Sequence, residues 1–283
     1  MEYVEFFYSL RHLSDTINSR STNKPFKDYY RTDSSLPSML ESDGRTMRTG
    51  TKSYAEADSL LREGDYESLK MLNEFNLPNN IKRTSMYKTQ VRKSVCGSLP
   101  NVPLCLRGVP TNMLDFRRTK VSGRTIDIIV NAGVGKHVSA EDIIKAGSLI
   151  TSAIKEIEER GIRVNLYTII CSKGDDGSVV EMVVNLKKSE SPLNMLGIAY
   201  PLINPSFLRR IFFRFLETIP VKELDIHYIQ CYGSVVSVED CISKSSNPRM
   251  LSFKEAIKID LSDLCDLPAS TIKQTIISQL KMN

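Results

Sequence analysis

Residues 125–171 constrain the fold of this chain more than any other segment. A short apolar run at 125–130 leads into a loop at 131–137, and apolar residues then recur at helical spacing from 143 to 157. A β-rich run follows at 162–171. Because two strands joined by one helix are normally parallel neighbours, the segment predicts a βαβ unit.

The helix of this unit has recognisable start and end signals. Ser139 is a typical N-cap residue, and Glu141 and Asp142 place negative charge where the helix dipole is positive. Gly161 follows the last apolar position, as expected of a residue that ends a helix in a left-handed conformation. These signals predict a helix that fills the space between the two strands.

The chain after this unit alternates expected strands and helices. We expect a turn at 174–177, a strand at 179–186, a helix at 205–216, a strand at 224–232, a helix near 237–243, a strand near 256–259 and a last helix near 270–281. Such alternation predicts an α/β domain over 125–283, with a mostly parallel central sheet and helices on both faces.

Residues 1–78 are expected to form a helical N-terminal extension of this domain. Apolar residues at helical spacing predict a first helix over 1–19. Residues 20–50 have no period and are rich in polar residues and proline, which is typical of an extended arm. Two short helices follow, and Ser53 with Glu56 forms the capping box that opens the first of them.

Residues 79–124 form a basic connecting segment that is rich in proline and glycine. Three prolines and two glycines between 97 and 113 exclude a long helix or a central strand there, so we expect an ordered irregular excursion. Ten basic residues and one acid, Asp115, give this segment a net charge of +9. The candidate polyanion-binding residues are Lys82, Arg83, Lys88, Arg92, Lys93, Arg107, Arg117, Arg118, Lys120 and Arg124.

This local charge has three readings, which the sequence leaves open. A solvated basic face without a partner is one, and docking onto an acidic protein surface is another. The third is nucleic acid held through its phosphates, with Tyr87 and Phe116 as stacking candidates. The sequence has no recognition helix, RNA-binding strand motif or zinc finger, which argues against sequence-specific binding.

The cysteines and histidines argue against a metal centre. The six cysteines are scattered without a CxxC pair, and only three histidines are present, at positions 12, 137 and 227. Zinc motifs recognisable from sequence place their ligands at short spacing, so we expect no metal and no cofactor, with thiols that are reduced and mostly buried. No apolar stretch is long enough for a membrane helix, and the N-terminus lacks the features of a signal peptide, so no membrane contact is expected.

The loop after the first strand of the unit is the most suggestive place for a ligand. Gly133, Gly135 and Lys136 invite comparison with phosphate-binding loops. A P-loop requires glycine where Val130 stands and a hydroxyl residue where His137 stands, and a dinucleotide fingerprint would require a third glycine at position 138. Nucleotide binding is therefore disfavoured, and a tight turn is the simpler explanation of the glycines.

The same loop resembles the metal-ion site of von Willebrand factor A-type domains, in which the first strand ends in Asp-x-Ser-x-Ser. The matching positions here are Asn131, Gly133 and Gly135, so the acid is an amide and both hydroxyls are missing. The resemblance implies a von Willebrand factor A-like, or Rossmann-like, α/β fold. The losses imply a degenerate, metal-free loop, because hard divalent cations require oxygen ligands.

The segment from Val95 to Met113 resembles a stretch in uncharacterised phage and prophage proteins. Its Gly-…-Pro-x-Val-Pro-…-Gly-x-Pro-x-x-Met pattern precedes a strand and a helix like those at 125–160, and the likeness covers roughly residues 50–200. It implies a phage or prophage context, with the protein in the bacterial host cytoplasm or in a virion. It brings no catalytic residues.

These observations favour a non-enzymatic protein-interaction or structural module. We expect it to bind a protein partner or to associate with itself. Nucleophilic catalysis has little support, because nothing near Cys96 or Cys105 in the sequence marks either thiol as activated. The alternative is a nucleic-acid-associated protein that uses the basic 82–124 stretch.

Overall fold

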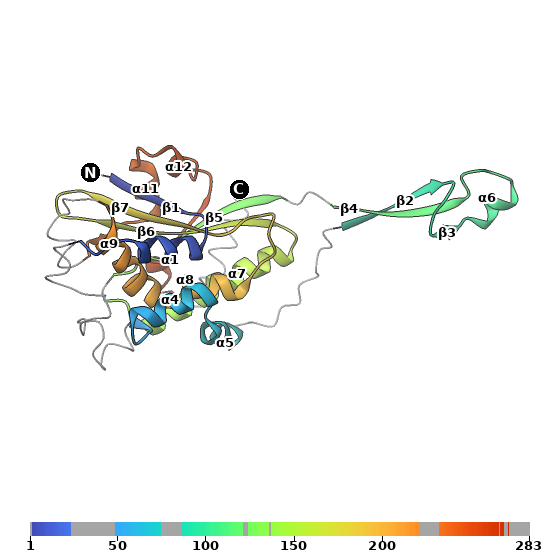
Figure 1. The fold of residues 1–283 in the computed structure, drawn as a ribbon. Coiled ribbons are helices and arrows are strands. Elements are labelled where there is room, and N and C mark those ends of the chain that lie inside the picture. The colour runs from blue at the N-terminus through green and yellow to red at the C-terminus, as the bar shows by residue number, and fades with distance from the viewer. Residues whose placement is uncertain are drawn as a thin grey trace.

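A mixed, mostly parallel β-sheet is the centre of the protein (Figure 1). The computed structural model describes residues 2–23, 49–74, 87–120, 124–135, 137–220, 232–265, 267–268 and 271. Helices pack on this sheet, and a smaller three-stranded sheet stands apart from it. The expected α/β class is confirmed.

The central sheet has the strand order β1-β7-β6-β5-β9, with β8 paired to the end of β6. Its strands are β1 (Glu2–Phe7), β5 (Thr125–Asn131), β6 (Arg163–Lys173), β7 (Val179–Lys187), β8 (Ser234–Val235) and β9 (Ile257–Asp260). The pairs β1/β7, β5/β6 and β5/β9 are parallel, whereas β6 is antiparallel to β7 and β8. Strand β5 is therefore an inner strand, with a parallel partner along each of its two hydrogen-bonding edges.

The predicted βαβ unit is confirmed. Strands β5 and β6 are parallel, and α7 (Ala140–Glu159) connects them. The Ser139 side chain accepts a hydrogen bond from the Asp142 backbone N–H, which caps the helix as expected. Gly161 has a φ of +85°, the left-handed conformation predicted for the residue that ends the helix.

Helices cover both faces of the sheet, and each face has its own apolar cluster. The larger cluster lies under α1 (Leu10–Ser19), α4 (Tyr54–Glu63), α7, α8 (Met195–Ile203), the π-helical η2 (Phe207–Phe212), α9 (Phe213–Thr218) and α13 (Leu261–Cys265). The smaller cluster lies under α11 (Val238–Lys244) and α12 (Pro248–Leu251). Ile128 and Val130 belong to the first cluster and Ile129 to the second, as the alternation of side chains along a strand requires.

The helix expected over 1–19 is wrong for residues 2–7, which form β1 at the edge of the sheet. Tyr3 and Phe7 pack on the larger cluster, whereas Val4 and Phe6 pack on the smaller one. This alternation is the period of a strand, although the apolar spacing also fits a helix. Helix α1 starts at Leu10, where the Ser9 side chain accepts a hydrogen bond from the His12 backbone N–H.

The remaining N-terminal expectations have mixed outcomes. The two short helices are confirmed as α4 and α5 (Tyr66–Glu74), and Ser53 caps α4. The side chains of α1 and α4 enter the same core as those of α7, so these helices are packed on the sheet. Most of the arm expected at 20–50 lies outside the described residues.

Downstream of β6, most expected elements are present. Strand β7, the turn before it, helices η2 and α9, helix α11 and strand β9 confirm the predictions for 179–186, 174–177, 205–216, 237–243 and 256–259. The strand expected at 224–232 and the last helix at 270–281 fall almost entirely outside the described residues. Helix α8 and the short helices α12 and α13 were not predicted.

The basic segment forms a β-hairpin arm, where an irregular excursion was expected. Strands β2 (Tyr87–Ser94) and β4 (Met113–Lys120) pair in antiparallel register, and the short β3 (Leu99–Pro100) adds to the end of β4. Helix α6 (Val102–Leu106) lies at the tip. In Figure 1 the arm extends away from the α/β body. The prolines and glycines lie in the tip, so they do not interrupt the two long strands.

Candidate functional site

The loop at the carboxyl end of β5 is closed by the side chain of Asn131. This side chain is fully buried, and its Nδ2 donates to Asp260 Oδ1 at 2.7 Å and to the Val236 carbonyl at 2.9 Å. Its Oδ1 accepts from the Gly133 backbone N–H at 2.9 Å. Asp260 in turn accepts hydrogen bonds from the Val238 backbone N–H at the start of α11. The amide therefore ties β5, β9 and α11 together.

The two glycines of the loop do not leave a cradle for a phosphate. A Cβ added at Gly133 would lie 2.9 Å from Asn131 Oδ1, and one at Gly135 would lie 2.6 Å from the His137 ring. Protein atoms thus occupy the space beside each glycine. Lys136 lies outside the described residues, and His137 is exposed. The glycines allow a tight turn around the Asn131 amide, which is the simpler of the two explanations.

A small, mostly apolar recess lies next to this loop. Ala132 and Val134 of the loop form one side, and Pro201, Phe207 and other apolar residues form the rest. Asn204 is the polar residue of the lining. Sites for anionic or polar substrates present several convergent polar groups, which this recess lacks.

The hairpin arm has one apolar and one polar face. Side chains of cross-strand partners lie on the same face of a sheet. Val91 of β2 is the partner of Phe116 of β4, and Leu114, two residues before Phe116 on the same face, is the partner of Leu99 of β3. The other face carries Gln90 opposite Arg117 and Arg92 opposite Asp115. The arm is therefore amphipathic in the manner of a sheet that packs against a partner on one side.

The apolar face of the arm is exposed. Val91 is 57 % exposed, Leu99 52 % and Phe116 43 %. The tip adds Val95, Val102 and Leu106, the last of these 84 % exposed. Contiguous exposed apolar side chains at one place mark interaction surfaces, whereas single ones do not.

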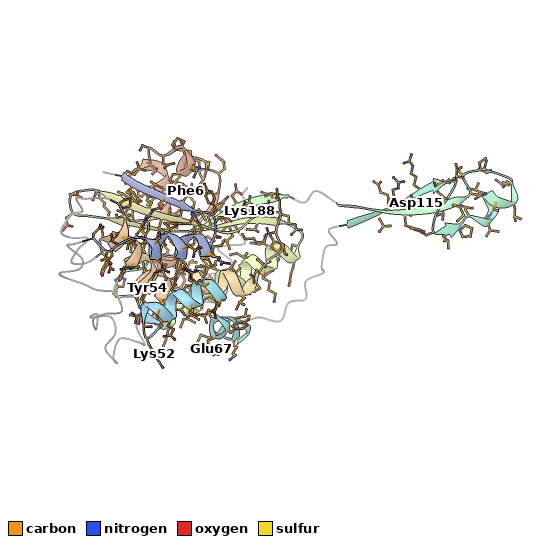
Figure 2. The ribbon with its side chains drawn as sticks, viewed as in Figure 1. Phe6, Lys52, Tyr54, Glu67, Asp115 and Lys188 are labelled. Atoms are coloured by element: carbon orange, nitrogen blue, oxygen red, sulfur yellow. The ribbon has the colours of Figure 1, made fainter. Side chains whose placement is uncertain are left out.

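The structure places part of the candidate polyanion-binding set on the arm. Arg92, Lys93, Arg107 and Arg117 are exposed there, and Arg124 is exposed at the start of β5. Arg117 Nε donates to Asp115 Oδ2 at 2.8 Å, and Figure 2 shows Asp115 on the arm, far from the body. Lys93 lies opposite Leu114 on the apolar face.

The other members of the set are described less fully or not at all. Lys88, Arg118 and Lys120 have backbone positions on β2 and β4. Lys82 and Arg83 lie outside the described residues. Among the described side chains, the exposed cations of the arm lie on the same small sheet as its exposed apolar residues.

Together these features define a class: an α/β protein with a mixed sheet, a closed loop at the end of its central strand and a projecting amphipathic hairpin. The chain belongs to the family described as Domain of unknown function (DUF7192), whose model matches residues 1–260. The match includes the central sheet and the arm. No curated protein and no solved structure matches the chain. No helix within the described ranges is both long and apolar enough to cross a membrane.

Proposed function

We propose that this protein is a non-enzymatic interaction module whose hairpin arm docks onto another subunit. The observation that carries the proposal is the exposed apolar face of the arm, formed by Val91, Leu99 and Phe116, with Leu106 also exposed in the helix at the tip. A hairpin of this kind is marginally stable in water unless a further layer covers one face. A partner surface would provide that layer.

The charge distribution favours a second copy of this chain as the partner. The chain carries +5 in total, and residues 80–124 carry +9, so the remaining residues carry −4. Arg92 and Arg117 on the polar face and Arg107 near the tip would lie at the rim of the contact. A basic rim around an apolar centre complements an acidic body, and charge complementarity of this kind guides docking. The arm of one copy would therefore dock onto the body of another.

The test is the mass of the protein in solution. Size-exclusion chromatography with light scattering should show concentration-dependent oligomers of the full chain. The double variant Val91→Thr and Leu106→Ser keeps β-branching in the strand and removes two apolar anchors, so it should shift the protein to monomer. Tyr66→Ser, which removes an exposed aromatic residue from α5, is the matched control and should leave the mass unchanged. A wild-type chain that stays monomeric at all concentrations would contradict the proposal.

Nucleic-acid binding is the second candidate, and the exposed cations of the arm favour it. Arg92 and Arg117 lie at diagonal positions on the polar face, because Arg92 is opposite Asp115 and Arg117 is opposite Gln90. If they contact phosphates, co-purified nucleic acid should raise the 260/280 nm absorbance ratio and be removed by salt. The double variant Arg92→Gln and Arg117→Gln should then lose that material. Under the first proposal, the same variant should retain its oligomers at low salt.

The same proposal extends to fold family and cellular context. The strand, loop and helix at 125–159 support a von Willebrand factor A-like, metal-free domain, because the loop follows a central strand and Asn131 stands where that family has its acid. The likeness of the Val95–Met113 segment supports a phage or prophage origin, and with it a location in the bacterial host cytoplasm or a virion. Structure determination of the oligomer at high concentration would test the structural role.

A further inference from the structure

Two thiols and one carboxylate converge under helix α11. Cys171 on β6 and Glu181 on β7 are direct partners in the antiparallel register, so their side chains point to the same face of the sheet. Cys241 of α11 packs on that face. The two Sγ atoms and a carboxylate oxygen all lie within 4.8 Å of one another.

All three side chains are buried among apolar residues. Cys171 is 0 % exposed, Glu181 1 % and Cys241 3 %. The thiols belong to the smaller apolar cluster, whose other members include Ile129, Ile169, Val183, Val238, Met250 and Phe253. Oε2 of Glu181 is buried and has no hydrogen-bond partner within the described part of the chain. A buried carboxylate oxygen without a donor is costly, so either a proton or a bound cation must offset its charge.

The cluster has no neutralising ion pair, because the ion pairs of the described residues do not include Glu181. Burial raises the pKa of Glu181 to about 7, and it also raises the pKa of the Cys171 thiol. Both groups therefore favour their protonated forms in the metal-free protein, and a cation bound here would displace those protons.

We propose that Cys171, Cys241 and Glu181 form a binding site for a thiophilic divalent cation, Zn²⁺. Two thiolates and a carboxylate are a suitable donor set for zinc, and one tetrahedral position remains for water or another ligand. With Zn–S bonds of about 2.3 Å, tetrahedral ligand atoms lie roughly 3.3 to 3.8 Å apart, so the three groups need to approach only slightly. Binding releases the protons that the two thiols, and the carboxyl group where protonated, carry in the metal-free protein.

A zinc ion here would have a structural role. It would join strands β6 and β7 to helix α11. This helix starts at Val238, whose backbone N–H donates to Asp260 of β9. The site lies in the body, and the proposed interaction surface lies on the arm. Zinc binding and self-association can therefore fail independently.

The experiment measures zinc binding to the full chain under reducing conditions. Cys96 and Cys105 are exposed thiols on the arm, so both are first replaced by serine to remove competing ligands. Plasma mass spectrometry should find one zinc ion per chain in this background. Cys241→Ser should abolish zinc binding. Glu181→Gln should lower the affinity for zinc by more than about tenfold, since even the loss of a residue that only supports a ligand lowers metal affinity by that factor. Cys265→Ser removes a buried thiol from the other apolar cluster and should leave zinc binding unchanged.

A second measurement does not depend on how well the variants fold. Co²⁺ added to the metal-free parent should produce a thiolate-to-cobalt charge-transfer absorption, which Zn²⁺ should then abolish by displacement. Saturating Zn²⁺ should also raise the melting temperature by about 5 °C. Absence of the cobalt band, unchanged zinc content in Cys241→Ser, or a disulfide between Cys171 and Cys241 that persists under the reducing conditions of the experiment would overturn the proposal.

Discussion

Replacing Asn131 by aspartate should make the stability of the protein depend strongly on pH. Asn131→Asp keeps the shape of the side chain but turns the donor that faces Asp260 into an acceptor. The present Nδ2 to Oδ1 distance is 2.7 Å. Burial already raises the pKa of Asp260, and the hydrogen bonds from Asn131 and from the Val238 backbone N–H oppose that rise. Two carboxylates at this distance cannot both be ionised, so the folded variant must hold one proton between them.

The size of the effect follows from proton linkage. Keeping one carboxyl group protonated at pH 7, against an ordinary pKa of about 3.9, costs at most about 4 kcal/mol. The folded state then binds one more proton than the unfolded state, so the free energy of unfolding decreases as pH rises. Between about pH 5 and the raised pKa of the pair, the loss should be about 1.4 kcal/mol per pH unit relative to wild type. Below about pH 4 the penalty should nearly disappear.

Urea unfolding at several pH values measures this dependence directly. Asn165→Asp is the matched control, because Asn165 Nδ2 donates to Asp127 Oδ1 at the same distance of 2.7 Å, but in an exposed position. There, solvent should limit the cost to about 1 kcal/mol, with little pH dependence. A flat pH profile for Asn131→Asp, or equal profiles for the two variants, would refute the assignment of the Asn131 amide as the donor to Asp260.

Three further results are expected. Gly147→Ala should lower the free energy of thermal unfolding by at least about 3 kcal/mol, because the new Cβ would lie 1.8 Å from the Leu202 carbonyl oxygen where α7 meets α8. A variant as stable as the wild type would contradict this close approach of the two helices. Glu158→Gln should lower the free energy of unfolding in urea by about 3 kcal/mol, because Glu158 Oε1 lies 2.9 Å from the buried Lys187 Nζ and the variant removes the carboxylate charge. A loss below about 1 kcal/mol would show that other groups stabilise the ammonium of Lys187. Mg²⁺ should not raise the melting temperature, because Asn131 Oδ1 already accepts a hydrogen bond from the Gly133 backbone N–H. A clear rise would show that the loop after β5 binds the metal ion.

The core of the fold was predictable because local and tertiary signals agree there. Strand β5, helix α7 and strand β6 combine an uninterrupted apolar run, an N-cap at Ser139 and a glycine at 161 that takes the required positive φ. Strand β1 was mistaken for a helix because a short apolar segment with aromatic residues fits both periods. Only its pairing with β7 decides between them, and that partner lies far away in the sequence.

The arm was misjudged for a different reason. Its prolines and glycines at 97–110 shape only the tip, so they say nothing about the strands on either side of it. Strands β2 and β4 are rich in charged residues, and among the strands that the structure describes they pair with each other and with β3. Alternation of Val91 with Arg92, and of Phe116 with Arg117, was the available signal for an amphipathic sheet.

The thiol and carboxylate cluster could not be recognised from spacing. Cys171 and Cys241 are separated by 70 positions in the sequence, and Glu181 looks like a polar residue on the solvent side of a strand. Register brings Glu181 opposite Cys171, and the packing of α11 brings Cys241 to both. Zinc motifs identified by short spacing describe ligands on one loop or helix, so they do not detect ligands from three elements.

Asp260 and Glu181 are two acids of the body with different surroundings. Asp260 is partly buried and accepts hydrogen bonds from the Asn131 amide and from the Val238 backbone N–H, so donors of the protein stabilise its charge. Glu181 is fully buried, and its Oε2 has no hydrogen-bond partner within the described part of the chain. Burial raises the pKa of this carboxyl group to about 7 and outweighs a hydrogen bond with the Cys241 thiol, which lowers the pKa. Without a metal ion a proton neutralises Glu181, whereas zinc would replace that proton and the protons of both thiols.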